Sequence, residues 1–279
     1  MGMIEFNSGL KNESGTPIMA HIDETIAKVI QTTIKRNFKN WDYKSIGVGY
    51  SGTGKSTGTR QFGNYIKYIL KKDYNINIDV HVCFTADEFE RIATMAPKYS
   101  VLILDEGFAD LNSNVTRSKD FQKIVNLLQI IRARSFFIYL NLPNFFDLSK
   151  SVALFQTNHL FVFETDKNDN RGQIRVFDRP RKQALYLKGK VDLNYYAYRP
   201  NFLARFYKDE KAMDNAAYEK KKLEHFTNLN KKLNEPSDKS QRNVVLIKLK
   251  TIHGWKVKDL IELFGLKKSQ IHQILRNGT

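Results

Sequence analysis

The chain has 279 residues, a length that supports one α/β domain and a small helical domain. Its single cysteine, Cys83, excludes an internal disulfide and a four-cysteine zinc cluster, and is typical of a buried strand residue in a reducing compartment. The sequence has no apolar run of about 20 residues and no cleavable leader, so we expect a cytoplasmic protein without a membrane partner.

The formal net charge is +16, and it is unevenly distributed. Residues 1–178 carry 22 basic and 19 acidic side chains, whereas residues 179–279 carry 23 basic and 10 acidic ones. A basic segment attracts polyanions, so the last third of the chain favours a nucleic acid or an anionic membrane surface as partner. The alternative is that this positive charge only keeps the protein soluble.

The first two thirds of the chain alternate between strand and helix patterns, which predicts a mostly parallel sheet wrapped by helices. Isoleucines and a valine at helical spacing predict an earlier helix that packs on this core (Ile22, Ile26, Val29, Ile30 and Ile34). Arg179-Pro180 predicts the turn of a hairpin that pairs 173–178 with 184–188 at the sheet edge. The other predicted elements are strand 44–50, helix 55–70, strand 76–84, helix 86–95, strand 100–105, helix 118–132, strand 135–141 and strand 159–164.

Residues 49–56 read Gly-Tyr-Ser-Gly-Thr-Gly-Lys-Ser, a complete G-x-x-x-x-G-K-S phosphate-binding loop between a predicted strand and a predicted helix. Its glycines let successive backbone N–H groups point at phosphate oxygens. Lys55 adds a positive charge for the β and γ phosphates, and Ser56 offers a hydroxyl to Mg²⁺, a role that Thr57 can share. The loop therefore predicts binding of ATP with Mg²⁺, through Gly49, Ser51, Gly52, Thr53, Gly54, Lys55, Ser56 and Thr57.

Four apolar residues, 101–104, lead into Asp105 and Glu106. This pattern is typical of a buried parallel strand that places carboxylates at its C-terminal end, where ligands of α/β sheets lie. We expect Asp105 to hold the metal and Glu106 to activate the attacking water. The alternative is that Glu106 is an ordinary exposed residue after a strand. No Asn-Lys-x-Asp run typical of GTPases is present.

With these two motifs, residues 43–165 resemble the additional-strand, catalytic-glutamate division of P-loop ATPases, which includes the RecA-like, AAA+ and FtsK/HerA groups. The segment from Leu128 to Phe163 is also similar to zonular-occludens-toxin-like and DNA-packaging ATPases. The resemblance implies a RecA-like core, a homo-oligomer and a γ-phosphate sensor at Asn141, although an asparagine here also suits a turn. It further implies that Arg132 or Arg134 reaches a neighbouring subunit's site, the alternative being a cap on a helix C-terminus.

The C-terminal residues fit three short helices, 241–252, 256–264 and 268–276, with Gly265-Leu266 between the last two. This is helix-turn-helix spacing, and it resembles DNA-binding tri-helical domains of the resolvase and regulator type. A tri-helical protein-docking module is the alternative. On the DNA-binding interpretation, the start and outer face of the last helix contact DNA through Lys267, Lys268, Ser269, Gln270, His272 and Gln273.

These patterns divide the chain into a P-loop ATPase domain (1–207), a charged helical linker (208–240) and a helix-turn-helix domain (241–279). A tyrosine-rich stretch, 195–207, has two interpretations: it stacks on single-stranded bases, or it packs a terminal segment onto the core.

The sequence as a whole predicts an ATP hydrolase that acts on DNA, as an oligomeric translocase or a packaging or mobilisation motor. One alternative is an ATP-switched DNA-binding regulator or replication helper, as helicase loaders are. Another is a small-molecule kinase with a DNA-binding appendage, against which the acidic pair and the lack of a recognisable acceptor-binding lid argue.

Overall fold

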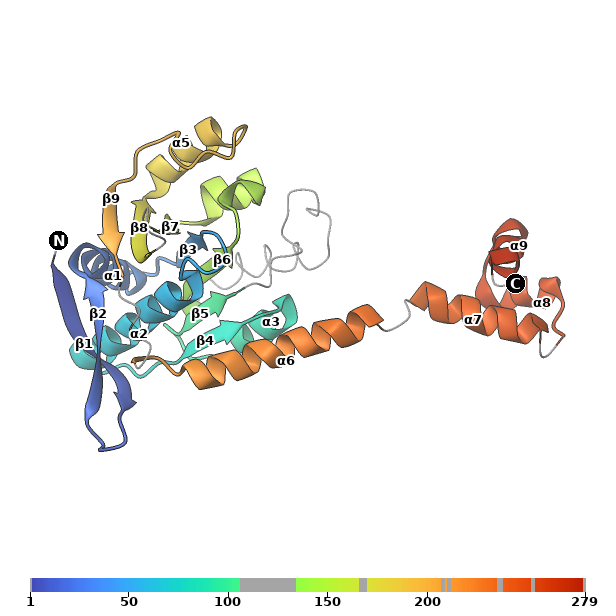
Figure 1. Ribbon diagram of the computed structural model, residues 1–279, viewed down its shortest axis with the longest axis horizontal. Helices are drawn as coiled ribbons and strands as arrows, with labels where there is room; N and C mark the ends of the chain where they lie inside the picture. The colour runs from blue at the N-terminus through green and yellow to red at the C-terminus, as the bar shows by residue number, and fades with distance from the viewer. Residues whose placement is uncertain are drawn as a thin grey trace. The chain divides into compact units, whose positions relative to one another are not determined.

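The computed structural model describes residues 2–105, 134–165, 170–206, 209, 212–234, 238–251 and 254–277 (Figure 1). The predicted helix 118–132 lies outside these residues, as do Glu106 and Arg132. The chain divides into two compact units, Met1–Glu219 and Lys220–Thr279. Each unit is described by itself below, and the domain boundaries at 207 and 240 stay predictions.

The first unit is built on a seven-stranded sheet with the strand order β4-β5-β6-β3-β7-β8-β9. The first five strands of that order are parallel to their neighbours, and β8 runs antiparallel to both β7 and β9. This confirms the predicted α/β fold with a mostly parallel sheet. The strands are β3 (Tyr43–Val48), β4 (Val80–Cys83), β5 (Val101–Leu104), β6 (Phe137–Leu142), β7 (His159–Thr165), β8 (Arg171–Phe177) and β9 (Phe202–Arg205).

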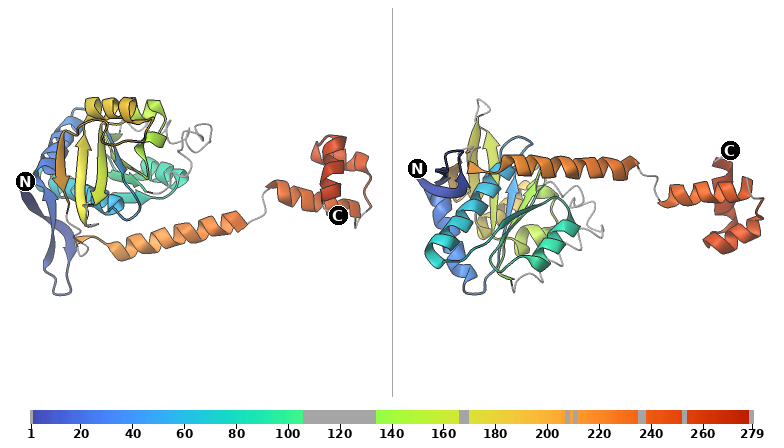
Figure 2. Two further views of the ribbon diagram at one scale, coloured as in Figure 1. Left: turned by 45° about the horizontal axis from the view of Figure 1, so that its top comes forward. Right: turned by 90° about the horizontal axis from the view of Figure 1, so that it is seen from below.

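Helices cover both faces of the sheet (Figures 1 and 2). Successive residues of β5 alternate between the two cores: Val101 and Ile103 pack with one set of helices, and Leu102 and Leu104 with the other. The first core holds α1 (Glu24–Asn37) and α2 (Lys55–Tyr74). The second holds α3 (Ala86–Met95), α5 (Arg179–Gly189) and the short turns η3 (Phe145–Asp147) and η4 (Val152–Gln156).

An N-terminal hairpin, β1 (Met3–Lys11) with β2 (Pro17–Asp23), was not predicted from the sequence. Ile22 lies on β2, and α1 begins two residues later because the Asp23 side chain accepts hydrogen bonds from the first backbone N–H groups of the helix. The predicted helix is therefore present but starts later than its isoleucine pattern suggests. The hairpin tip, residues 12–16, is exposed and projects away from the sheet (Figures 1 and 2).

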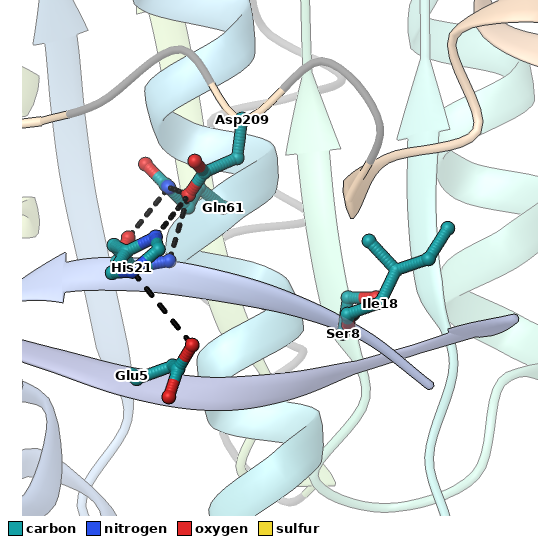
Figure 3. A network of polar contacts seen from close by, with 6 residues as sticks. All are labelled: Glu5, Ser8, Ile18, His21, Gln61 and Asp209. Carbon is teal, nitrogen blue, oxygen red and sulfur yellow. Dashed lines mark hydrogen bonds and ion pairs between the residues drawn. The ribbon is translucent and has the colours of Figure 1, made fainter. Parts of the chain in front are cut away.

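A polar network fastens the base of this hairpin to α2 (Figure 3). The backbone N–H of His21 donates to Asp209 Oδ2 (2.7 Å), and Gln61 Nε2 donates to the carbonyl of His21 (2.6 Å) and to Asp209 Oδ2 (3.1 Å). The imidazole lies between Asp209 (3.4 Å) and Glu5 (3.9 Å). The network thus ties together the hairpin, the segment after β9 and α2, the helix that follows the phosphate-binding loop and is called the P-loop helix below.

The predicted hairpin at Arg179-Pro180 is wrong, because α5 occupies that segment. Asp178 caps the helix by accepting from the Arg181 N–H (3.0 Å), and Pro180 lies in the first turn, where its missing N–H costs nothing. Leu185 of the helix is fully buried in the core. β8 instead pairs with β9, which follows α5.

In the second unit, the segment of α6 (Asn215–Asn234) beyond the unit boundary precedes α7 (Asp238–Thr251), α8 (Val257–Phe264) and α9 (Lys268–Asn277). Leu246, Leu260 and Ile271, one from each of the last three helices, are fully buried together. Gly265 ends α8 at φ 62°, a left-handed conformation that suits glycine. Three helices therefore form where predicted, and their helix-turn-helix role stays a prediction. No helix of the described residues is long and apolar enough to cross a membrane.

Candidate functional site

The phosphate-binding loop joins the C-terminal end of β3 to the N-terminus of α2. Gly49 and Gly54 have φ values of 149° and 96°, in the left-handed region. A Cβ at Gly49 would lie 2.4 Å from the carbonyl oxygen of Phe163, and one at Gly54 would lie 2.3 Å from the ring of Phe206. These two positions therefore require glycine both for conformation and for space.

The lysine of the loop folds back onto the loop itself. Lys55 Nζ donates to the carbonyl of Gly49 (2.6 Å) and to that of Tyr50 (3.1 Å). Thr53 is buried, and its hydroxyl also donates to the Tyr50 carbonyl (2.9 Å). The other predicted nucleotide-binding residues lie in the same loop and in the first turn of α2. Ser51 and Gly52 are exposed, and Ser56 and Thr57 are half-buried.

Four polar side chains converge at the C-terminal ends of β5 and β6, beside the first turns of α2. Asp105 Oδ1 accepts hydrogen bonds from Ser56 Oγ (3.0 Å) and from Asn141 Nδ2 (3.0 Å). Asn141 Nδ2 also donates to Thr59 Oγ1 (2.9 Å). Asp105 and Asn141 are at most 1% exposed. The structure thus brings together Ser56, Asp105 and Asn141, which three separate sequence patterns indicated, and Lys55 directly precedes Ser56 in the chain.

Sheet register explains why Asn141 reaches this position. Asn141 pairs with Gly47 of the adjacent parallel strand β3, and a Cβ at Gly47 would lie only 2.6 Å from Asn141 Oδ1. Glycine therefore leaves room for the amide. Asn141 Oδ1 is buried and has no hydrogen-bond partner within the described residues. A buried acceptor without a donor is costly, so this oxygen is suited to a donor brought by a ligand or by water.

The donor set fits a magnesium ion. Mg²⁺ binds oxygen ligands, and in nucleotide sites it is held by one or two carboxylates together with substrate phosphates. The Ser56 hydroxyl and the Asp105 carboxylate supply such oxygens 3.0 Å apart. These are the two described side chains whose oxygens could hold the ion.

The structure adds residues that sequence reasoning missed. Thr59 lies one helical turn after Lys55, and this spacing is a sequence signal that it faces the same side of the helix as the lysine. Arg171, on β8, has an Nη2 atom 3.7 Å from where a Cβ of Gly52 would lie. Tyr218, on α6, donates a hydrogen bond to Asp105 Oδ2 (2.7 Å). No motif marks Arg171 or Tyr218, because each is brought to the site by tertiary packing.

A cleft of about 740 Å³ lies against the start of the loop. Tyr195 is mostly buried there: its hydroxyl donates to Asn144 Oδ1 (2.9 Å), and burial raises its pKa well above the ordinary value. Tyr196 is 69% exposed, with the Arg175 guanidinium 3.7 Å from its ring centre. Tyr50, in the loop, also lines this cleft. Its walls are formed by Gly49, Tyr50, Thr53, Pro143, Asn144, residues 162–165 and residues 192–196.

The tyrosine-rich stretch packs onto the core, as one of its two interpretations predicted. Tyr195 and Tyr198 contact the core cluster that includes α5. Stacking of single-stranded bases on the remaining exposed rings stays a prediction.

Arg134 lies just before the start of β6, whereas Asn141 lies near the C-terminal end of that strand. Its backbone carbonyl accepts from the Tyr99 N–H before β5 (3.2 Å), and its guanidinium donates to the carbonyl of Thr94 (3.2 Å) at the end of α3. Within this chain it therefore caps α3. A role for Arg134 or Arg132 in a neighbouring subunit's site stays a prediction, as does the role of Glu106.

The six residues predicted to bind DNA lie at the start of α9. All are exposed, whereas Ile271, among them in sequence, is fully buried against the other two helices. The backbone N–H of Lys267 donates to Gln270 Oε1 (3.0 Å), which fixes the start of the helix. The exposed set is Lys267, Lys268, Ser269, Gln270, His272 and Gln273.

No protein-family model and no curated protein matches this sequence. Among solved structures, the chain is similar to the N-terminal domain of zonular occludens toxin from Neisseria meningitidis, with 14% identity and a TM-score of 0.41, over 62% of this chain and 98% of that one. It is also similar to the genome packaging NTPase B204 from Sulfolobus turreted icosahedral virus 2, with 15% identity over 50% of this chain and 94% of that one. The TM-scores are 0.35 for the complex with AMP and 0.36 for that with AMPPCP. The α/β fold itself follows from the strand order described above.

Proposed function

We propose that this protein is an ATPase that acts on DNA, working as an oligomeric translocase or as a packaging or mobilisation motor. The observation that carries the proposal is the convergence of Ser56, Asp105 and Asn141 at the C-terminal ends of the strands, directly after the phosphate-binding loop that Lys55 belongs to. A phosphate loop next to a buried carboxylate and a partly unsatisfied amide is suited to phosphoryl chemistry.

In this proposal the loop N–H groups and Lys55 bind the phosphates, with the nucleoside in the cleft between Tyr50 and Tyr196. Ser56 and Asp105 would hold Mg²⁺, which when bound neutralises phosphate charge. Asn141 uses its unpartnered oxygen to accept a hydrogen bond from the attacking water and so senses the terminal phosphate beside it. Glu106, the next residue after Asp105, accepts the proton of that water.

The exposed polar face of α9 and the concentration of positive charge in residues 179–279 support DNA as the partner. The same face supports a second candidate, an ATP-switched DNA-binding regulator or replication helper. The two candidates differ in turnover: a motor hydrolyses ATP continuously on DNA, whereas a switch hydrolyses it slowly and binds a preferred sequence.

Hydrolysis assays with and without DNA test the proposal. We expect DNA to stimulate the wild type, and we expect Lys55→Ala to lower the rate by about 100-fold or more, because a positive charge at the phosphates is lost. Lys71→Ala is the matched control, since Lys71 is an exposed lysine later on the same helix. Slow turnover with sequence-preferring binding would favour the switch. Equal rates for Lys55→Ala and wild type would defeat the enzymatic proposal.

A further inference from the structure

The carboxylate of Asp105 is completely buried, and the chain supplies hydrogen-bond donors to both of its oxygens. Oδ1 accepts from Ser56 and Asn141, which belong to the site predicted from sequence. Oδ2 accepts from the hydroxyl of Tyr218 (2.7 Å), 113 residues further along the chain. A carboxylate offers about four acceptor positions, so the chain's own donors occupy most of them.

Tyr218 is held in place by the P-loop helix. The guanidinium of Arg60, on α2, lies 4.4 Å from the centre of the Tyr218 ring, within cation–π range. Arg60 also donates to the side-chain oxygen of Asn215 (3.0 Å) and to the carbonyl of Asp214 (2.8 Å). Phe84, which follows β4, also contacts the ring, with 5.8 Å between the two ring centres. One buried arginine thus fixes the first turn of α6 against α2.

The next residue of α2 fixes the segment that leads to this turn. Gln61 donates to Asp209, which also accepts the backbone N–H of His21 (Figure 3). Two consecutive residues of the P-loop helix therefore hold the chain before α6 and at its start. This anchoring brings Tyr218 to Asp105. The ring alone would pack against Arg60 and Phe84, so the hydroxyl adds a specific hydrogen bond to the buried carboxylate.

We propose that the Tyr218 hydroxyl and a bound metal–nucleotide complex compete for the carboxylate of Asp105. On this proposal, Asp105 takes up its metal role only as the Tyr218 hydroxyl leaves Oδ2, and the first turn of α6 loosens as it does so. The start of α6 therefore changes when the metal–nucleotide complex binds. This helix continues beyond Glu219 into the C-terminal unit. This inference rests on the proposed function, in which Asp105 serves a metal-bound nucleotide.

The coupling is reciprocal. If metal-nucleotide binding weakens the contact between Tyr218 and Asp105, then removal of the contact must strengthen metal-nucleotide binding. Tyr218→Phe is the cleanest change, because it removes the hydroxyl and keeps the ring that stacks on Arg60. A hydrogen bond to a charged group contributes about 1.4 kcal/mol or more, so we expect about a tenfold lower Mg²⁺ concentration for half-maximal binding of a non-hydrolysable ATP analogue.

The experiment uses the full-length protein and two measurements. The first is a Mg²⁺ titration of analogue binding. The second is backbone hydrogen exchange of residues 215–222 with and without the Mg²⁺ analogue complex. In the wild type, we expect exchange in this turn to rise about tenfold on loading, as expected for loss of one charge-assisted hydrogen bond. In Tyr218→Phe, we expect it to be high already and to change little.

Tyr65→Phe is the matched control, because Tyr65 is a buried tyrosine of α2 whose hydroxyl bonds Gln31 (2.8 Å), away from the site. We expect this variant to behave as the wild type in both measurements. Weaker or unchanged Mg²⁺ dependence in Tyr218→Phe would overturn the inference, as would exchange in the wild type that does not respond to loading. If the wild type fails to bind the analogue at all, the proposed function falls and the inference with it.

Discussion

The two units of the molecule present their candidate functional residues in opposite ways. In the first unit, Ser56 and Asn141 both donate hydrogen bonds to Asp105, and Asp105 and Asn141 are buried. In the second, the polar residues of α9 are all exposed and lie over a small core. A buried cluster depends on the position of single atoms, whereas an exposed basic face acts through summed charge. Single substitutions should therefore have large effects in the first unit and small ones in the second.

Among the substitutions that test this contrast, we expect the largest effect from a change of Asn141. Asn141→Ala removes the donor to Asp105 and Thr59 and the unpartnered oxygen beside the phosphate site. We expect ATP hydrolysis to fall about 100-fold, as when one preorganised donor is lost from an active site. Single-turnover rates, measured beside analogue binding, test this. Analogue affinity should change little, and a change confined to affinity would show that Asn141 positions the nucleotide only.

A smaller effect is expected on α9. Lys267→Ala with Lys268→Ala should weaken DNA binding by about tenfold and reduce the slope of log affinity against log salt by about 2, because two phosphate contacts are lost. Fluorescence anisotropy at several salt concentrations measures both quantities. Lys258→Ala, an exposed lysine on α8, is the control. An unchanged salt slope in the double variant would favour the protein-docking alternative.

The smallest effect concerns acid stability of the first unit. Burial lowers the pKa of His159, at the start of β7, to about 4, from about 6.5 in an unfolded chain. Below pH 6.5 the unfolded chain binds a proton that the folded one does not, so stability is lost as the pH falls from 6.5 to 4. Since His159 is only partly buried, we expect a loss of about 1 kcal/mol.

His159→Phe should flatten this part of the stability curve, because phenylalanine keeps a ring beside Tyr43 and does not titrate. Urea unfolding at pH 7 and pH 4.5 compares the two proteins. If the pH-dependent difference is as large in the variant as in the wild type, another group causes the loss.

The sequence predicted what local patterns determine. The loop of residues 49–56 is contiguous, and Asp105 and Asn141 each follow an apolar strand, so parallel strand order alone brings them to one edge. The α5 helix was missed because Arg179-Pro180 suits a turn as well as a helix start, and only the cap at Asp178 decides between them. Tyr218 was missed because tertiary packing, which leaves no periodic signal, brings it to Asp105.

The central claim is that the phosphate loop and the Asp105 cluster form one metal-nucleotide site. Binding of a non-hydrolysable ATP analogue, measured with Mg²⁺ and with EDTA in wild type and in Asp105→Asn, tests it most directly. The account predicts that Mg²⁺ tightens binding to the wild type by about tenfold or more, and that the isosteric variant loses this gain while it still binds the metal-free analogue. An equal gain from Mg²⁺ in both proteins would contradict the account.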